Sequence, residues 1–594
     1  MVAAVRDFCG IPTVDQPCAY CPVCPMFHIL SDVLRSSANN HRGSKPCWIQ
    51  QSSVGEDLIL TYDSAVECVD RHVDALYESL SNLSARNTIT VVFLCNNSLD
   101  FALSILAVSQ ISAFHEGHVC PALLNTRWSL SDMVAALQPA ESILIVYGLE
   151  WQYIAESVRE KLSKRVEAKK VSLPLFGKAA LTPISRQQNM ARRNHHSEMK
   201  FDPNLFLESG VENLSAHDAV LVFTSGTTSI AKGVRLSHRA LLMQAAAKIT
   251  PPCDYSSTTR MLATTVPFFH VGGLSSLLAV WMTDGALVES STASNGFSPS
   301  NVWDSISHKA FPINTLVVVP AMVHSLHQTG HHRSRINCFP HVDLILVGGQ
   351  SLSMSQQTFL SKTFPAARIV QTFACTEAAS SLTFLDVTEP PEFDTTKVIH
   401  PPGVCVGRPP GHVRLQLFSA SQEGATEASK INSPYQVGLI GTRGPHVMNG
   451  YWGKEARQPD EWYITSDFGY WDKLGQLYFC GRQTDTIRTG GETVWATEVE
   501  QILQRHSDVA EVAVFGLPDE LFGETVACAI VLNPIPKANL TLHELKRWCS
   551  DEGLARYKHP RRLVILSSLP RNTSGKILKH QLKESFAEMP HSRL

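Results

Sequence analysis

The chain has 594 residues, of which 44% are hydrophobic and 18% are charged. This length exceeds what one hydrophobic core usually supports, so we expect roughly two to four domains. The net charge of -3 does not favour a nucleic-acid-binding or membrane-surface protein. No apolar run reaches the roughly 18 residues that a membrane-spanning helix needs. The sequence therefore predicts a globular protein of ordinary composition, without a membrane span.

Residues 1–50 lack a clear hydrophobic period and are interpreted as an N-terminal extension. A CxxCxxC cluster at residues 18–24 could bind zinc if Cys9 or His28 supplied a fourth ligand. No second CxxC pair lies nearby, so a loose segment is favoured over a metal site. No apolar region follows the first charges, which argues against a secretory signal and leaves an organelle-targeting role open.

Strands and helices alternate in the first part of the chain. The hydrophobic pattern predicts, in order, a helix over Leu58–Leu83, a strand over Ile89–Leu94, a helix over Leu99–Ala113, a strand over Ile143–Tyr147 and a helix over Tyr153–Leu162. Such alternation is typical of βαβ units around a parallel sheet. Residues 164–215 carry a mixed charge pattern and are interpreted as an irregular insertion with short elements.

A loop rich in hydroxyl side chains follows the predicted strand Ala219–Phe223. It contains Thr224, Ser225, Gly226, Thr227, Thr228 and Ser229, and then Lys232 and Gly233. Backbone N–H groups, hydroxyls and a lysine can together bind phosphate oxygens. The loop differs from a Walker A loop, in which glycine precedes the lysine and a hydroxyl residue follows it. A polar surface turn between two strands is the alternative.

Four further predicted strands also end in residues suited to bind a ligand. They span Met261–Val266, Thr315–Val319, Val342–Val347 and Ala367–Phe373. The residues that follow them include His270, Gly272 and Gly273; Pro320; Gly348, Gly349 and Gln350; and Ala374, Thr376 and Glu377. Ligands in open α/β sheets bind beyond the carboxyl ends of the strands. The sequence therefore predicts that these ends converge on one pocket.

The composition changes after about residue 400. Glycine turns separate short segments that resemble antiparallel β elements. A compact α+β pattern follows, with a helix over Thr497–His506, strands over Val509–Phe515 and Val526–Leu532, and a helix over Leu542–Glu552. We place a domain boundary near residues 482–487, which leaves a C-terminal unit of normal domain size.

Several motifs in one order resemble the adenylate-forming superfamily of acyl-CoA synthetases, coumarate-CoA ligases, luciferases and peptide-synthetase adenylation domains. They are the loop at 224–234, Phe373 to Glu377, Thr465-Ser466-Asp467, Gly481-Arg482, Gly490-Gly491-Glu492 and Ser574-Gly575-Lys576. The resemblance covers residues 55–585. It implies an α/β fold with a large N-terminal domain (51–482) of βαβ sheets plus a β subdomain. A hinge (483–487) and a small, mobile α+β domain (488–594) follow.

The resemblance also implies a reaction in two steps. A carboxylate attacks the α-phosphate of MgATP to give an acyl-adenylate and pyrophosphate, and coenzyme A (CoA) then displaces AMP. The loop and Lys232 would bind the β- and γ-phosphates, Thr376 the α-phosphate, and Glu377 the Mg2+ ion. Lys576 would contact the carboxylate and phosphate oxygens in the first step only. The alternative for both Glu377 and Lys576 is an ordinary solvent-exposed charge without a catalytic role.

The same resemblance assigns the remaining candidate residues. Asp467, assisted by Arg482, would bind the ribose, and Gly490 and Gly491 would face the pantetheine arm of CoA. The nucleotide would also contact Gly348, Phe373 and Ala374. The acyl pocket would be formed by His270, Gly272, Gly273, Gly349, Gln350 and Ser380. His270 is treated as a catalytic candidate, with a gating or structural role as the alternative, and Asp467 could be a plain turn aspartate.

The sequence departs from the superfamily pattern in the hydroxyl-rich loop, in the segment expected to contact the nucleotide, and in the later β region. Ser229 and Ala231 stand where glycine and proline are usual, Phe373-Ala374 replaces Tyr-Gly, and Leu439 stands where glutamate is common. None of these changes removes a candidate catalytic residue. We therefore expect activity with an altered nucleotide affinity.

The strand-end segments most resemble plant and algal 2-succinylbenzoate-CoA ligases of phylloquinone (naphthoquinone) synthesis. The alternatives are a 4-coumarate-like or medium-chain acyl-CoA synthetase, and a non-catalytic nucleotide- or acyl-binding relative. Ser592-Arg593-Leu594 resembles a C-terminal peroxisomal address, which implies a peroxisomal import receptor as partner. Residues 1–50 could direct some of the protein to a plastid.

Overall fold

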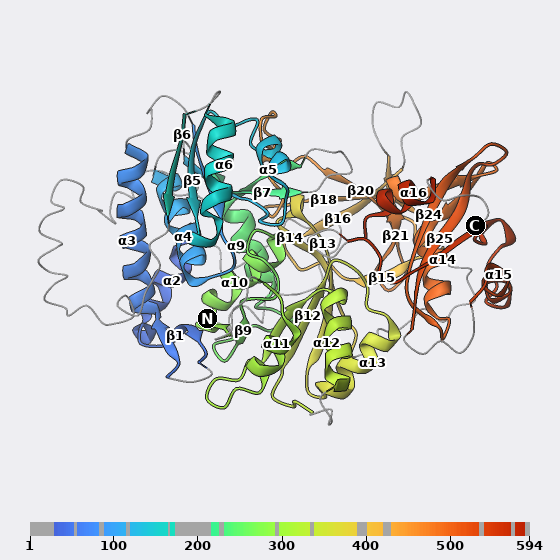
Figure 1. Ribbon diagram of the computed structural model, residues 1–594, viewed down its shortest axis with the longest axis horizontal. Coiled ribbons are helices and arrows are strands. Elements are labelled where there is room, and N and C mark those ends of the chain that lie inside the picture. The colour runs from blue at the N-terminus through green and yellow to red at the C-terminus, as the bar shows by residue number, and fades with distance from the viewer. Residues whose placement is uncertain are drawn as a thin grey trace, which may run out of the picture.

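The structure is a computed structural model in which most of the chain is described (Figure 1). The described residues are 29–52, 56–81, 88–114, 119–163, 167–172, 216–224, 231–290, 296–332, 338–388, 401–419, 429–533, 540–571 and 577–587. Three sheets form a large body, and a fourth sheet forms a smaller domain at the right of Figure 1. No helix in these ranges is long and apolar enough to span a membrane.

A seven-stranded sheet with the order β19-β8-β7-β4-β3-β5-β6 forms one layer of the body. Its strands are β3 (Ile89–Leu94), β4 (Val119–Leu123), β5 (Ser142–Tyr147), β6 (Glu167–Ser172), β7 (Asp218–Thr224), β8 (Lys232–Ser237) and β19 (Gly450–Tyr451). Its helices are α3 (Tyr62–Ser81), α4 (Leu99–Phe114), α5 (Leu130–Ala136) and α6 (Gln152–Leu162), with a 3-10 turn η3 (Leu149–Trp151). β3 pairs in parallel with β4 and β5, and every residue of β3 is buried, as expected of a strand covered on both faces. The predicted βαβ alternation is confirmed.

An eight-stranded sheet with the order β14-β13-β12-β11-β9-β10-β1-β2 lies beside it. Its strands are β1 (Pro46–Gln50), β2 (Leu58–Thr61), β9 (Arg260–Leu262), β10 (Ala286–Glu289), β11 (Thr315–Val318), β12 (Leu344–Gly348), β13 (Arg368–Cys375) and β14 (Ser380–Asp386). Its helices are α9 (His238–Ala247), α10 (Val271–Met282), α11 (Pro299–Ile306), α12 (Pro320–His332) and α13 (Met354–Thr363). Strands β9, β11, β12 and β13 are adjacent and parallel, so four of the five predicted ligand-facing ends share one sheet edge. The fifth, the end of β7, belongs to the seven-stranded sheet.

The chain near residue 50 differs from the sequence interpretation. The segment begins with α2 (Asp32–Ser37) and the π-helical turn η2 (Ala38–Arg42), and β1 then pairs in parallel with β10 inside the eight-stranded sheet. Trp48 on β1 is only 2% exposed. Residues 29–50 are therefore part of the large body rather than of an extension, and Leu58–Thr61 is β2 rather than the start of a helix. The CxxCxxC cluster lies outside the described residues.

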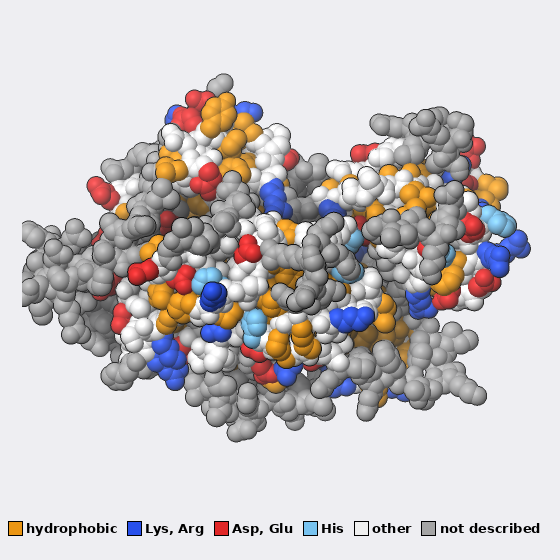
Figure 2. Space-filling view, turned by 60° about the horizontal axis from the view of Figure 1, so that its bottom comes forward, with side chains coloured by type: hydrophobic (Ala, Val, Ile, Leu, Met, Phe, Trp, Pro, Cys, Tyr) orange, Lys and Arg blue, Asp and Glu red, His pale blue; other side chains and the backbone are white. Residues whose placement is uncertain are grey.

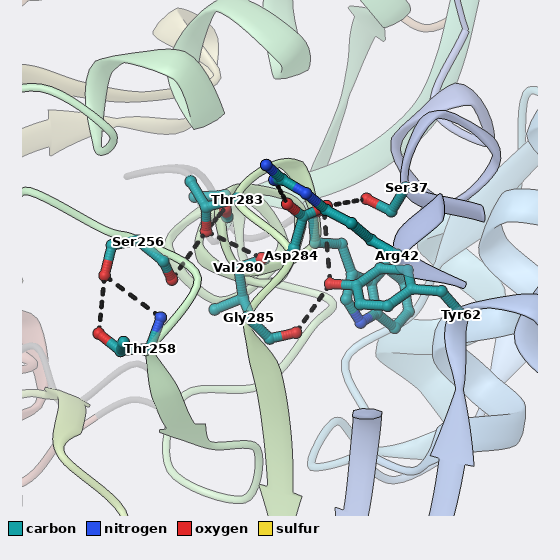
Figure 3. A network of polar contacts seen from close by, with 11 residues as sticks. Ser37, Arg42, Tyr62, Ser256, Thr258, Val280, Thr283, Asp284 and Gly285 are labelled. Atoms are coloured by element: carbon teal, nitrogen blue, oxygen red, sulfur yellow. Dashed lines mark hydrogen bonds and ion pairs between the residues drawn. The ribbon is translucent and has the colours of Figure 1, made fainter. Parts of the chain in front are cut away.

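A buried polar network joins this segment to the loop after α10 (Figure 3). Asp284, which has a φ of +60°, accepts hydrogen bonds from Ser37 and Arg42. The hydroxyl of Tyr62 donates to the Gly285 carbonyl at 2.7 Å. These contacts satisfy polar groups that would be costly to bury alone, and they fix the first described helix against the core.

A six-stranded antiparallel sheet, β15-β21-β20-β18-β16-β17, forms the predicted β subdomain. Its strands are β15 (Val404–Gly407), β16 (Arg414–Phe418), β17 (Lys430–Ile431), β18 (Gly438–Arg443), β20 (Tyr463–Trp471) and β21 (Leu477–Arg482). It lies between the body and the C-terminal domain in Figure 1.

The C-terminal domain starts after the 3-10 turn η7 (Gln483–Asp485). It contains β22 (Thr486–Thr489), β23 (Glu492–Trp495), β24 (Val509–Asp519), β25 (Gly523–Leu532), β26 (Arg562–Leu566), α14 (Ala496–Gln504), α15 (Leu542–Asp551) and α16 (Lys579–Ala587), with a 3-10 turn η8 (Arg556–Lys558). Two core clusters are drawn from residues 487–586 alone, so the unit has its own core. The predicted fold class, a large α/β domain with a small α+β domain behind it, is confirmed.

Charged side chains are distributed in agreement with the small net charge. On the face shown in Figure 2, acidic and basic side chains are interspersed over the described surface. Among the described residues on that face, no extended region of one charge sign is seen, such as proteins that bind the phosphate backbone of nucleic acids present.

Candidate active site

The predicted phosphate loop connects two paired strands. β7 and β8 are antiparallel, and Thr224 at the end of β7 is the register partner of Lys232 at the start of β8. The residues between them, which include Ser225, Gly226, Thr227 and Thr228, lie outside the described residues. The Lys232 side chain is exposed, and its ammonium nitrogen lies 5.4 Å from the centroid of the Tyr451 ring. The hairpin therefore presents a cation beside its connecting loop.

The turn between β13 and β14 carries Thr376 and Glu377. A single 3-10 turn, η6 (Thr376–Ala378), is followed by Ala379, whose φ of +56° lies in the left-handed region. We call residues 376–379 the β13–β14 turn. Its left-handed residue is not a glycine, so the surrounding contacts must stabilise a backbone conformation that alanine rarely adopts.

Glu377 is held at both its backbone and its side chain. Its carbonyl accepts a hydrogen bond from the Met448 N–H at 2.8 Å, and its carboxylate accepts one from the Tyr451 hydroxyl at 2.9 Å. The Tyr463 hydroxyl lies 3.3 Å from that of Tyr451. Burial, together with the nearby Glu377 carboxylate, raises the pKa of Tyr451 to about 12. Tyr451 therefore stays neutral and remains a hydrogen-bond donor.

Tyr451 is a site residue that the sequence interpretation missed. It belongs to β19, which pairs with β8 and so adds to the seven-stranded sheet beside the phosphate hairpin. The structure thereby brings together Lys232, Tyr451 and Glu377, which come from three distant parts of the sequence. The aromatic Gly450-Tyr451-Trp452 segment was a visible signal, but its pattern indicated only a β element.

Asp467 and Arg482 face each other on the β subdomain. They are register partners in β20 and β21, and the Arg482 Nε atom lies 3.3 Å from the Asp467 carboxylate. The Asp467 side chain is only 8% exposed. A carboxylate that is paired with an arginine on one side keeps oxygen lone pairs that can accept hydrogen bonds from neutral donors such as sugar hydroxyls.

The nucleotide candidates on β13 are half-buried. Phe373 packs against Phe479 of β21, with ring centroids 5.5 Å apart, and Ala374 follows it. Gly348 ends β12 and has only the Thr372 methyl group near the place of a missing Cβ atom, at 3.5 Å. The edge of the eight-stranded sheet is thus lined here by small or aromatic residues.

The acyl candidates His270, Gly272 and Gly273 open helix α10. His270 is the N-cap, and its ring lies 4.8 Å from the Phe269 ring. A Cβ atom at position 273 would collide with the carbonyl of Pro267, whereas one at position 272 would meet only a Val266 methyl group at 3.9 Å. Gly273 therefore serves close packing, while Gly272 leaves open space beside it.

Ser380 marks the other side of this region. Ser380 is 2% exposed and its hydroxyl accepts a hydrogen bond from Ser275 at 3.1 Å. The Ser275 hydroxyl in turn accepts a hydrogen bond from the ammonium group of Lys248. Burial lowers the pKa of Lys248 from 10.5 to about 7. Ser380 is therefore the end of a buried hydroxyl chain rather than a freely exposed pocket residue.

Gln350 is bound to the C-terminal domain. Its side-chain oxygen accepts a hydrogen bond from Arg571 at 3.0 Å, and the same guanidinium bonds to Glu511 on β24 at 2.9 Å. We call these three residues the Arg571 anchor. Arg571 also forms an isolated β-bridge with Ile577, so the residues that flank the segment 572–576 are paired. Lys576 itself lies outside the described residues.

The residues near the predicted hinge have defined contacts. Asp485 in η7 lies 3.8 Å from the Lys579 ammonium, which also bonds to Glu500 at 2.8 Å. Gly490 and Gly491 form the turn between β22 and β23 with φ angles of +57° and +83°, which favour glycine. The role of the hinge and of these two glycines stays a prediction.

The donor set around Glu377 fits Mg2+ that is shared with a nucleotide. Magnesium usually takes one or two carboxylates, with the remaining positions filled by water and phosphate oxygens. Glu377 offers one carboxylate, and the Tyr451 hydroxyl lies beside it. Lys232 lies against the Tyr451 ring and can offset the negative charge of a phosphate. Among the described residues no cluster of three His, Cys, Asp or Glu could form an all-protein metal cage.

Comparisons with known proteins find matches over most of the chain. The model of the AMP-binding enzyme family matches residues 34–452, and that of the AMP-binding enzyme C-terminal domain matches residues 498–576. The chain is similar to "2-succinylbenzoate–CoA ligase, chloroplastic/peroxisomal" of Arabidopsis thaliana, with 29% identity over 90% of this chain and 96% of the relative. It is also similar to an oxalate–CoA ligase of Arabidopsis thaliana, with 27% identity over 91% and 96%.

Solved structures share the fold. The o-succinylbenzoate CoA synthetase of Bacillus subtilis, in complex with its acyl-adenylate intermediate, aligns with a TM-score of 0.68 and 23% identity. The alignment covers 93% of this chain and 97% of that one. ATP-bound MatB of Rhodopseudomonas palustris aligns with a TM-score of 0.72 and 21% identity, covering 95% and 99%.

Proposed function

Because the chain belongs to the AMP-binding enzyme family, we propose that it joins 2-succinylbenzoate to CoA through an acyl-adenylate, with release of AMP and pyrophosphate. It is an AMP-forming acid–CoA ligase. The observation that carries the proposal is the meeting of Lys232, Tyr451 and Glu377 between the phosphate hairpin and the β13–β14 turn.

The first step must bring a carboxylate anion to a polyanionic nucleotide. Lys232 offers a positive charge for the β- and γ-phosphates, and Thr376 offers a hydroxyl for the α-phosphate. Donors that are fixed before the reaction stabilise the developing charge without a cost of reorganisation. Mg2+ bound at Glu377 would neutralise phosphate charge. The Tyr451 hydroxyl orients the Glu377 carboxylate through the hydrogen bond at 2.9 Å.

The remaining candidates bind the nucleoside and the acid. Asp467 accepts hydrogen bonds from the ribose hydroxyls, with Arg482 beside it. The acid enters between His270 and the β13–β14 turn, where Gly272 leaves space. Lys576 contacts the acid carboxylate and the α-phosphate during the first step. Rotation about residues 483–487 then replaces it with Gly490 and Gly491, which face the pantetheine arm of CoA.

Similarity to 2-succinylbenzoate–CoA ligases over nine-tenths of the chain supports this acid. The oxalate–CoA ligase relative favours a small dicarboxylic acid as the second candidate. Both candidates carry two carboxylates. The substrates of the other ligases of the same mechanism, 4-coumarate and octanoate, carry one carboxylate and a neutral or apolar tail instead.

A panel of acids tests the proposal. Pyrophosphate release is measured with MgATP, CoA and, in turn, 2-succinylbenzoate, oxalate, 4-coumarate and octanoate. The proposal predicts the highest kcat/KM with 2-succinylbenzoate. A higher kcat/KM for another acid would identify that acid as the substrate and would leave the assignment as a ligase unchanged. The absence of pyrophosphate release with every acid would identify a nucleotide-binding relative without activity.

We also propose that the protein acts in peroxisomes, in phylloquinone or naphthoquinone synthesis. The Arabidopsis relative is described as chloroplastic/peroxisomal, and Ser592-Arg593-Leu594 would bind a peroxisomal import receptor. These residues and residues 1–28 lie outside the described part of the chain. A fluorescent fusion that lacks Ser592-Arg593-Leu594 should become diffuse, and unchanged punctate import would refute the address.

A further inference from the structure

Gln244 on helix α9 bonds to the β13–β14 turn with its whole side-chain amide. Its Nε2 atom donates to the carbonyls of Ala378 and Ser381, each at 2.9 Å. Its Oε1 atom accepts the Ser381 N–H at 3.0 Å. Gln244 is completely buried. Both donors and the acceptor of this amide are therefore matched to backbone groups on the two sides of Ala379.

The turn depends on such partners because its own backbone bonds are few. The Ala379 N–H donates to the Thr376 carbonyl at 2.9 Å, which closes the single 3-10 turn. Beyond it, Ser381 is the register partner of Ala374 in the β13–β14 hairpin. Without the amide of Gln244, the carbonyls of Ala378 and Ser381 would lose buried hydrogen bonds at a left-handed alanine.

Glu377 and the residue after it are thereby held from two separate parts of the large domain. Tyr451 and Met448 contact Glu377 itself, from the segment that leads into and forms β19. Gln244 contacts the backbone of the next residue from α9. A metal carboxylate must be held within a few tenths of an ångström, because Mg2+ tolerates little departure from octahedral geometry.

We propose that Gln244 is a positioning residue that sets the Glu377 carboxylate for Mg2+ and ATP. It does not contact the substrates. It acts through the backbone of the β13–β14 turn, so its loss should weaken the use of Mg2+ more than the binding of the acid. The inference rests on the proposed role of Glu377 in binding Mg2+.

Lys248, the C-cap of the same helix, provides a matched control. It follows Gln244 by four residues and so lies about one turn further along the chain. It is equally buried, at 1% exposure, and its ammonium donates to the side chain of Ser275 rather than to the backbone of the turn. A methionine at either position keeps a similar volume and removes the polar contacts. The two variants therefore differ in whether the turn loses its support.

The test is a Mg2+ titration of acid-dependent ATP–pyrophosphate exchange in the full-length protein. Gln244→Met should raise the Mg2+ concentration for half-maximal rate about tenfold and lower kcat, with little change in the KM of the acid. Lys248→Met should keep the Mg2+ midpoint of the natural protein. Gln244→Glu retains an acceptor for the Ser381 N–H and, when its carboxyl group is protonated, can donate to one of the two carbonyls. It should give an intermediate midpoint and decides the test if Gln244→Met does not fold.

Glu377→Ala separates the inference from the proposed function. If Glu377→Ala shifts the Mg2+ midpoint but folded Gln244→Met and Gln244→Glu do not, the positioning role of Gln244 is wrong. If Glu377→Ala leaves the midpoint unchanged, the metal role of Glu377 is wrong, and the inference fails with it. A shift in Lys248→Met as large as in Gln244→Met would reduce Gln244 to a general packing residue.

Discussion

The β13–β14 turn and the Arg571 anchor differ in how they are held. The turn is fixed by buried hydrogen bonds from α9 and by a part-buried hydrogen bond from Tyr451 of β19, all within the large domain. The anchor joins two domains through a solvent-exposed hydrogen bond between Arg571 and Gln350. A buried group that loses its partner carries the full cost of desolvation, whereas an exposed one bonds to water instead. The turn is thus held more firmly than the anchor, whose exposed hydrogen bond water can replace.

This difference suits a reaction in two steps. The nucleotide is bound in both steps, so the residues that hold it gain from a permanent arrangement. Lys576, which follows Arg571 by five residues, is required only in the first step under our proposal. A hydrogen bond worth about 1 kcal/mol favours one domain arrangement roughly fivefold without locking it.

The largest expected effect comes from the turn. Glu377→Ala should lower the rate of adenylate formation by about a hundredfold or more, because a carboxylate that neutralises phosphate charge is lost. The rate of acid-dependent pyrophosphate exchange measures it. Glu377→Asp is the control, since it keeps the charge with a shorter side chain, and an unchanged rate in Glu377→Ala would place the metal elsewhere.

The next effect concerns Lys248, which is buried and bonds to Ser275. Lys248→Met should stabilise the protein by a few kcal/mol at about pH 6, since a buried amine with only neutral partners is costly to protonate. In the unfolded chain the amine is protonated up to its ordinary pKa of 10.5, but in the folded protein it loses the proton above about 7. The cost is therefore complete below about pH 7 and shrinks as the pH rises towards 10.5.

Thermal unfolding at two pH values measures this effect. The gain in Tm of Lys248→Met over the natural protein should be larger at about pH 6 than at about pH 9. A gain that grows with pH would contradict the lowered pKa of Lys248.

A smaller effect is expected at Tyr451. Tyr451→Phe removes the hydroxyl that bonds to Glu377 and keeps the ring beside Lys232, so adenylate formation should slow by about tenfold. Tyr463→Phe, one hydroxyl further away, should slow it less. The reverse order in the exchange assay would show that Tyr463 is the residue that matters.

The smallest effect is expected at the anchor. Arg571→Ala and Gln350→Ala should each slow adenylate formation by about fivefold and leave thioester formation from supplied acyl-adenylate unchanged. Glu511→Gln, which keeps the shape of the partner within the C-terminal domain, should have a weaker effect than either. Equal losses in both half-reactions would show that the anchor supports the fold rather than one domain arrangement.

The sequence predicted those site residues that come directly after a single strand. Thr376 and Glu377 come directly after the apolar run of β13, and Lys232 follows the hydroxyl loop after β7, so local patterns identified them. The parallel order of β9, β11, β12 and β13 then places their ends at one edge, as expected.

The residues that support the site could not be found in this way. Gln244 lies 134 residues from Ala378, and Tyr451 lies 74 residues from Glu377. Each occupies a segment whose local pattern is satisfied by helix or strand alone. Likewise, β1 is only five residues long and is stabilised by pairing with β10, which is distant in the sequence, and with β2, which follows it after a loop. Long-range pairing of this kind leaves no period in the sequence.

The most direct test of the proposed two-step mechanism is the measurement of both half-reactions in Lys576→Ala. We predict that the variant loses acid-dependent pyrophosphate exchange almost completely but converts supplied 2-succinylbenzoyl-adenylate and CoA into the thioester at nearly the natural rate. Loss of both half-reactions together, or retention of both, would contradict a lysine that serves the first step alone.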